Sequence, residues 1–142
     1  MTLYDAIKVQ TVLQAVVNGS ETLIKKDTSG NIIKDEDTGK AVTVPPKYEL
    51  PFDAKLSIAR IDKVITEEVS LYRETKKKEY VSTFGVAYED ADEEQKVKMD
   101  ADFVETASNI EIVKEIPKLK EESLSSAELP YEYIKILLPI LE

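Results

Sequence analysis

The chain has 142 residues, of which 28 are acidic and 19 basic, so its net charge at pH 7 is −9. This balance argues against a general binder of the nucleic-acid backbone, although an acidic mimic of nucleic acid stays open. Because the chain has no cysteine and no histidine, it excludes disulfides, thiolate or imidazole metal sites and histidine-dependent catalysis. We therefore expect a binding protein with no cofactor and no metal, and not an enzyme.

The first segment, Thr2–Val17, is predicted to be a helix because its apolar residues recur at helical spacing. Thr2 with Asp5 resembles a capping box at the start of this helix, and Asn18-Gly19 is a sequence that typically ends a helix. No basic region followed by an apolar run is present, and no apolar stretch approaches the ~20 residues that cross a bilayer. We expect a cytoplasmic protein without membrane contact.

Residues 21–47 change in character. Short apolar runs alternate with the turn sequences Ser29-Gly30-Asn31 and Thr38-Gly39, which predicts a small β-hairpin or a three-stranded meander. The related strings DTSGNIIK and DEDTGKAV are consistent with a small duplication or with two turns of similar chemistry. The acids at 35–37 lack the spacing of a calcium-binding loop, so a solvated turn is expected there.

The clearest element is a helix over residues 51–80, which neither Gly nor Pro interrupts after its first position. About 28 residues of it, at 1.5 Å each, make a rod of about 42 Å, whereas a compact domain of this size has a diameter of roughly 37 Å. A homo-oligomer paired through this helix would explain the length, and coverage by the terminal helices is the alternative. One face of this helix carries an apolar stripe made of Ala54, Ile58, Ile61, Ile65 and Tyr72. A second row on the helix also contains apolar residues, namely Leu56, Val64 and Leu71.

The remaining segments complete a mainly helical α+β domain spanning 1–142. A short strand or a helical extension, an acidic mobile loop over 89–98, a short helix, a short C-terminal strand and a last helix are predicted in that order. Their ranges are Val81–Tyr88, Glu89–Lys98, Asp100–Ser108, Asn109–Ile116 and Ala127–Leu138.

Ligand-binding candidates lie on the long helix or close to it in sequence. Arg60 and Arg73 are the only arginines, and arginine is the preferred fork for phosphate or carboxylate groups. Tyr72, Tyr80 and Phe84 are close enough in sequence to stack on a base or ring. These five residues form the predicted site for a small anionic, nucleotide-like ligand, and surface ion pairing of the arginines is the alternative interpretation.

Three stretches carry a likeness to known proteins: MTLYDAIKVQTVLQAV, ELPFDAKLSIARIDKVITEEVSLYRE and DADFVETASNIEIVKEIPKLKEESLSSAELPYEYIKILLPILE. Through their order the chain resembles a family of small uncharacterised proteins from tailed phages of Gram-positive hosts, catalogued as a domain of unknown function. The hairpin-like segment 21–44 looks like an insertion relative to that pattern. No functional residue is carried over from the family.

The resemblance implies a phage-encoded accessory protein in the host cytoplasm, and two roles compete. The first is antagonism of a host defence, either by sequestering a small nucleotide signal or by masking a host protein. The second is a structural or assembly role in the phage particle. The two arginines and their aromatic neighbours favour ligand binding over assembly.

Overall fold

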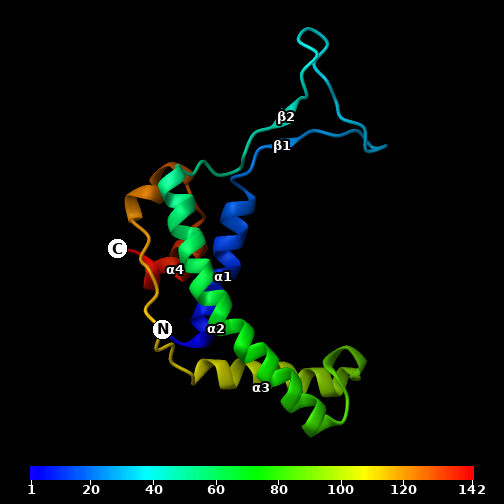
Figure 1. Ribbon diagram of the computed structural model, residues 1–142, viewed down its shortest axis with the longest axis vertical. Helices are drawn as coiled ribbons and strands as arrows, with labels where there is room; N and C mark the ends of the chain where they lie inside the picture. The colour runs from blue at the N-terminus through cyan, green and yellow to red at the C-terminus, as the bar shows by residue number, and fades with distance from the viewer.

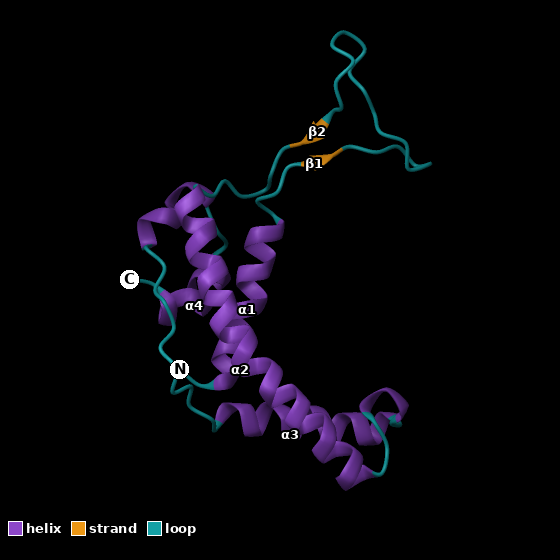
Figure 2. Ribbon diagram, in the orientation of Figure 1, coloured by secondary structure: helices purple, strands orange, loops and turns teal.

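The computed structural model describes residues 1–142 and has a mainly helical α+β fold, as the sequence predicts (Figures 1 and 2). Three short 3₁₀ helices are also present: η1 (Tyr88–Asp90) and η2 (Glu121–Ala127) lie between main elements, and η3 (Leu138–Ile140) follows the last one. No helix is both long enough and apolar enough to cross a membrane. The main elements in chain order are α1 (Leu3–Asn18), β1 (Leu23–Ile24), β2 (Thr43–Val44), α2 (Phe52–Phe84), α3 (Glu93–Ser108) and α4 (Tyr131–Leu137).

The start and end of α1 follow the local sequence, with one correction. Thr2 accepts a hydrogen bond from the Asp5 amide while the Asp5 side chain accepts one from the Thr2 amide, which confirms the capping box. Gly19 ends the helix in a right-handed conformation, with φ of −72°, so a left-handed cap is not its purpose. A Cβ at Gly19 would lie 2.7 Å from the ring of Tyr48, so glycine is needed here for space.

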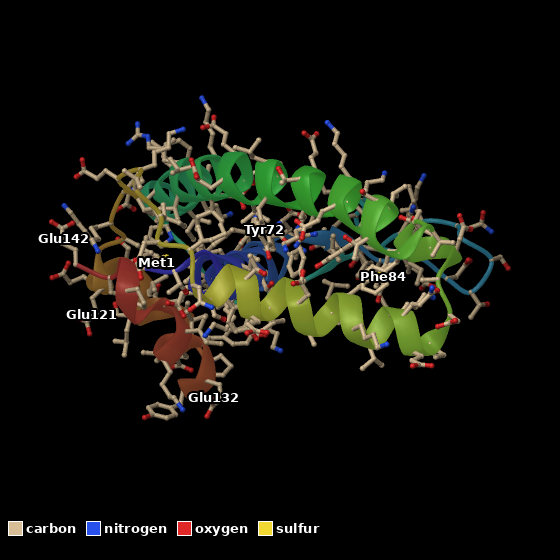
Figure 3. All side chains as sticks on the ribbon, turned by 90° about the horizontal axis from the view of Figure 1, so that it is seen from below. Met1, Tyr72, Phe84, Glu121, Glu132 and Glu142 are labelled. Carbon is tan, nitrogen blue, oxygen red and sulfur yellow. The ribbon has the colours of Figure 1, made fainter.

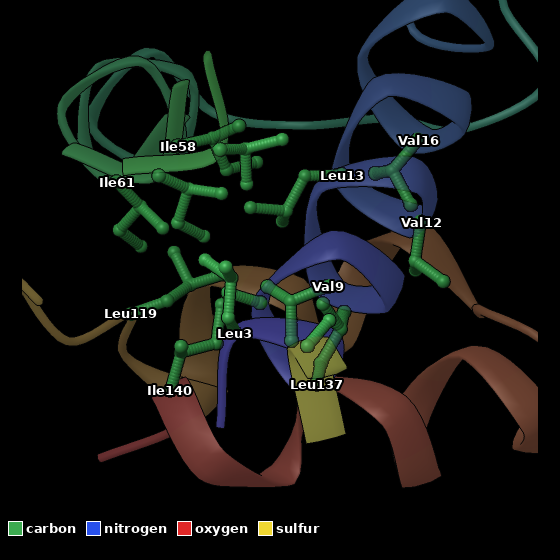
Figure 4. Packing of buried hydrophobic residues seen from close by; sticks show 14 of the residues in the cluster. Leu3, Val9, Val12, Leu13, Val16, Ile58, Ile61, Leu119, Leu137 and Ile140 are labelled. Carbon is green, nitrogen blue, oxygen red and sulfur yellow. The ribbon is translucent and has the colours of Figure 1, made fainter. Parts of the chain in front are cut away.

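The core forms where α1 packs against the first half of α2 and the C-terminal segment closes over both (Figure 4). Seventeen buried apolar residues make one cluster, and the predicted stripe of α2 is buried throughout. The labelled side chains in Figure 4 show α1, α2 and the C-terminal segment converging: Leu13, Ile58, Ile61, Leu119, Leu137 and Ile140.

The long helix extends to Phe84 rather than ending near residue 80, and Gly85 closes it with a left-handed φ of 75°. Residues 81–84 therefore extend the helix and do not form the short strand that was the other prediction for this segment. The 33 residues of the helix measure about 50 Å. The first half lies against α1, and the second half projects beyond the core with α3 beside it (Figure 1). A helix of the same chain thus accompanies the projecting half, and the length does not require a second copy.

The acidic segment 89–98 is not a loop, so that prediction was wrong. It contains η1 and the first turns of α3, which begins at Glu93. Asp92 accepts a hydrogen bond from the Gln95 amide at 2.8 Å, and the Gln95 side chain accepts one from the Asp92 amide, which makes a capping box. Acidic residues in a first helical turn are favoured by the helix dipole, and an acidic run there is a start signal as well as a mark of disorder.

The predicted C-terminal strand over residues 109–116 is also wrong. This segment is extended but pairs only at one bridge, between Thr2 and Glu111, with the amide of Leu3 bonded to the carbonyl of Ile110. The last helix is shorter than predicted because Pro130 precedes its first residue and Glu128 has a left-handed φ of 50°.

Residues 21–47 form a projecting arm at the end of the molecule opposite α3 (Figure 1). Two antiparallel strands of two residues each make its stem, and two turns branch from the stem. This confirms the β-hairpin character of the segment. The two turns share one chemistry, because Asp27 and Asp35 each accept backbone amides within their own turn, and Gly30 and Gly39 have positive φ.

Candidate functional site

The candidate site is a groove between the second half of α2 and the η1–α3 segment, with a cavity volume of about 410 Å³. The two helices run side by side here, and side chains from both fill the space between them (Figure 3). The α2 wall has three basic side chains, and the opposite wall has two acidic ones and three large apolar or aromatic ones. The lining residues are Arg73, Lys76, Lys77 and Tyr80 on α2, and Tyr88, Glu89, Met99, Asp100 and Phe103 opposite.

The floor of the groove is held by a polar network centred on Asp102. Lys76 donates to an oxygen of Asp102 at 2.8 Å, and the hydroxyl of Tyr80 lies 2.9 Å from the same oxygen. Lys76 is 6% exposed, and its second acidic neighbour, Glu79, lies 3.4 Å away. We call Lys76, Tyr80 and Asp102 the clasp, because they join α2 to α3.

Two tyrosines extend the clasp to the backbone of α3. The Tyr80 hydroxyl is 3.0 Å from the carbonyl of Met99, so its single proton is shared between that carbonyl and Asp102. About two helical turns earlier, Tyr72 donates to the carbonyl of Phe103 at 2.6 Å, and the two rings have centroids 4.8 Å apart. These contacts fix how α3 sits on α2.

The clasp shifts the pKa of each of its members. The hydrogen bond from Lys76 is the largest effect at Asp102 and holds the pKa of that carboxyl below its ordinary value. Burial lowers the pKa of Lys76, but Asp102 and Glu79 together outweigh it and the pKa lies above its usual value. Burial, followed by the hydrogen bond to Asp102, raises the pKa of the Tyr80 hydroxyl strongly. The network is therefore a charged lysine and a charged carboxylate with a neutral tyrosine at neutral pH.

The rim of the groove has free cationic groups. Arg73 and Lys77 are one turn apart on α2, both are exposed, and neither forms an ion pair within the chain. Across the groove, Tyr88 donates to Asp100 at 3.3 Å, and Lys96 lies 5.5 Å from the centre of the Tyr88 ring. A phosphate or carboxylate group bound at this rim would meet two unpaired cations beside an aromatic wall.

The structure brings together part of the predicted site. Arg73 and Tyr80 line the groove, whereas Tyr72 is buried beneath it and Phe84 packs on Tyr80 with ring centroids 6.1 Å apart. Arg60 is exposed, lines no part of the groove and precedes Arg73 by 13 residues, which is about 20 Å along the helix. Within one chain the two arginines do not act on one ligand.

Sequence reasoning missed the polar half of the site. Lys76 and Lys77 were not among the predicted site residues, because the helix was expected to end near residue 80, whereas it continues to Phe84. The signal was the spacing: Tyr72, Lys76 and Tyr80 are four residues apart and prolong the buried stripe, so Lys76 must face inward. Nothing in the sequence paired it with Asp102, which is 26 residues away.

A scan against protein-family models finds no match for this chain, and searches of curated proteins and of solved structures find no significant similarity. The resemblance to small phage proteins therefore stays a prediction.

The charged groups of the clasp are occupied by one another. Asp102 and Lys76 neutralise each other, and the Tyr80 hydroxyl is held as a donor. No group of three or more acidic side chains is placed to hold a metal ion. The groups free to contact a ligand are Arg73 and Lys77 at the rim and the faces of the aromatic side chains.

Proposed function

We propose that this protein is a non-enzymatic, phage-type accessory protein that sequesters a small anionic, nucleotide-like ligand in the groove between α2 and α3, and that it antagonises a host defence by doing so. The observation that carries the proposal is the pair of unpaired cations, Arg73 and Lys77, at the rim of an aromatic-walled groove on a chain of net charge −9. On so acidic a protein, an unpaired cationic rim is a place where an anion meets local attraction.

The chemistry of the rim matches this ligand class. An arginine guanidinium offers a planar fork of donors to a phosphate, and a lysine one turn away adds a second charge. Tyr88 is 41% exposed, so its ring can be reached by a base, and stacking contributes about 1–3 kcal/mol per base. Asp100 and Glu89 supply acceptors for the amino or imino groups of a base. A ligand with phosphate at one end and a base at the other would use both walls.

The test is calorimetric titration with a panel of cyclic dinucleotides and cyclic ADP-ribose isomers. We expect Arg73→Gln and Lys77→Gln each to weaken binding of the responding ligand about tenfold or more, because each removes one charged contact. Arg60→Gln is the matched control, since it makes the same change on the same helix outside the groove. It is expected to bind as the unmodified protein does.

Two results would contradict the proposal. One is the absence of heat and of thermal stabilisation with every ligand of the panel. The other is an equal loss of affinity in Arg60→Gln and Arg73→Gln, which would mean that the cations act through overall charge and not through the groove.

A role in assembling a phage particle is the second candidate function, and the projecting arm favours it. The outward side of α2 also keeps Leu56 and Leu71 exposed, at 40% and 65%, as a second copy paired along the helix would require. Val64 is half-buried. Co-purification with a virion component, without any response to the nucleotide panel, would favour assembly over sequestration.

A further inference from the structure

The arm at residues 21–47 contributes nothing to the core of its own chain. No residue of the arm belongs to the buried cluster or to the partly buried side chains packed against it. The arm leaves the body and returns to it at neighbouring points, where the Tyr48 amide donates to the Gly19 carbonyl at 2.9 Å. Ordering a backbone costs about 1–2 kcal/mol per residue, and this segment recovers little of that by burial within the chain.

The stem of the arm is exposed on both faces. Leu23 pairs with Val44 and Ile24 with Thr43, and the three apolar side chains of this ladder are 59%, 44% and 50% exposed for Leu23, Val44 and Ile24. An isolated two-stranded ladder is only marginally stable in water, whereas three or more strands stabilise one another. The arm therefore lacks the additional strands that would make it stable.

Of the two edges of the stem, the edge of β1 is the more open to such strands. Pro45 and Pro46 follow β2 directly and have no backbone amide to donate. They therefore disfavour the pairing of a further strand along the outer edge of β2. No proline flanks β1. The Lys25 amide donates to the Val42 carbonyl at 2.8 Å, so Lys25 and Leu23 point their backbone groups inward. Because antiparallel pairing alternates, the backbone groups of Thr22 and Ile24 point outward, where no strand pairs with them.

We infer that the open edge of β1 pairs with β1 of a second copy across a two-fold axis, giving a four-stranded antiparallel sheet. With the axis at Leu23, Thr22 of each copy exchanges backbone hydrogen bonds with Ile24 of the other. Glu21 then lies opposite Lys25 of the second copy, and the two leucines meet at the axis. This register is self-complementary, as a two-fold interface requires. Moving the axis to Ile24 places Glu21 opposite Asp27 instead, so charge selects the first register.

The overall charge also favours contact through the arm. Residues 21–47 contain five acidic and five basic side chains, so the net charge of −9 lies entirely in the rest of the chain. Two bodies repel each other, and two neutral arms do not. Antiparallel pairing places the two bodies at opposite ends of the shared sheet. The contact is short, so we expect a weak dimer that forms at micromolar concentrations.

Sedimentation equilibrium across micromolar concentrations tests this register by charge exchange. Glu21→Lys and Lys25→Glu each place like charges opposite one another twice in the dimer, so each should raise the dissociation constant about tenfold or more. The double variant restores both cross-strand pairs and should dimerise as the unmodified protein does. Rescue of this kind is not expected of a merely structural role within one chain.

A pair of proline variants tests which edge is used. Ile24→Pro removes an outward amide from the edge of β1 and should abolish the dimer. Thr43→Pro removes the corresponding outward amide from β2 and should leave it unchanged, which makes it the matched control. Leu71→Ser examines the outward face of α2 in the same way and should have no effect.

Three outcomes would overturn the inference: a protein that stays monomeric at every concentration, a double charge variant that is not rescued, or a dimer lost in Leu71→Ser and kept in Ile24→Pro. The first would leave the β1 edge to a strand from another protein, and the last would assign self-association to α2. Nucleotide binding in Ile24→Pro is measured in parallel and should not change, which separates this inference from the proposed function.

Discussion

The two halves of α2 continue one buried stripe but pack by different chemistry. In the first half, up to Val69, every buried residue is aliphatic, and the partners are α1 and the C-terminal segment. In the second half the buried residues are Tyr72, Lys76 and Tyr80, and the partner is α3. The periodicity of the helix is unbroken across the boundary, so only the identity of the side chains changes.

One helix therefore serves two purposes. Aliphatic burial is non-directional and contributes most of the favourable free energy of folding. A buried ion pair with hydrogen bonds contributes little net stability, because desolvation offsets the attraction, but it fixes geometry. The first half of α2 therefore anchors the fold, and the second half positions α3 and the groove and is expected to open locally at lower free energy.

The largest expected effect on the free energy of unfolding comes from removing a buried side chain in the first half of α2. Ile61 is 0% exposed, so Ile61→Ala should lower the free energy of unfolding by about 2–4 kcal/mol through lost burial and the cavity it leaves. Leu71→Ala on the same helix is the control, because that side chain is 65% exposed and should cost less than about 0.5 kcal/mol. Urea denaturation measures both, and similar losses would mean that the outward face is also buried in solution.

Breaking the clasp should have a smaller and more local effect. Asp102→Asn leaves Lys76 buried with only Glu79 nearby, and because the Asp102 side chain is 43% exposed we expect a loss of about 1–2 kcal/mol. Hydrogen exchange should quicken in α3 and after Tyr72 in α2, while α1 stays protected. Asp100→Asn is the control on the same helix. Uniform acceleration throughout the chain would refute the division of α2 into two units.

The contribution of the clasp should also depend on pH. The folded pKa of Asp102 is lowered, so its contribution is complete above the unfolded value of about 4 and is lost as the pH falls through the folded pKa. The folded pKa of Lys76 is raised, so its contribution is lost only as the pH rises beyond about 10.5. The difference in unfolding free energy between the unmodified protein and Asp102→Asn should therefore be constant near neutrality and shrink below about pH 4. A constant difference down to pH 2 would contradict the assignment.

The smallest expected effect is that of removing the arm. Replacing residues 21–46 with a short glycine-serine linker should change the unfolding free energy of the monomer by less than about 1 kcal/mol, because the arm buries nothing in the core and its ends are already joined at Gly19 and Tyr48. Thermal unfolding at low protein concentration measures this. A large loss would show that the arm supports the body.

Local sequence signals predicted those parts of the fold whose determinants lie within a few residues of one another. The capping box at Thr2, the stripe from Ala54 to Tyr72 and the two Asp-Gly turns of the arm are of this kind. The acidic run at 89–98 was misread because a charged first turn and a disordered loop have similar composition, and only the Asp92–Gln95 capping box distinguishes them. Of the residues that line the groove, Arg73 and Tyr80 were among the predicted site residues and Lys76 was not.

Composition and periodicity are enough to predict that α2 is long, which of its faces is buried and that the chain has no histidine or cysteine chemistry. Three further features depend on how the chain packs: α3 lies along the second half of α2, Lys76 contacts Asp102, and Arg60 and Arg73 lie on different surfaces. The physical reason is that helical periodicity specifies direction around an axis but not what occupies that direction. The occupant is set by a chain reversal at Gly85 and by contacts between residues far apart in sequence.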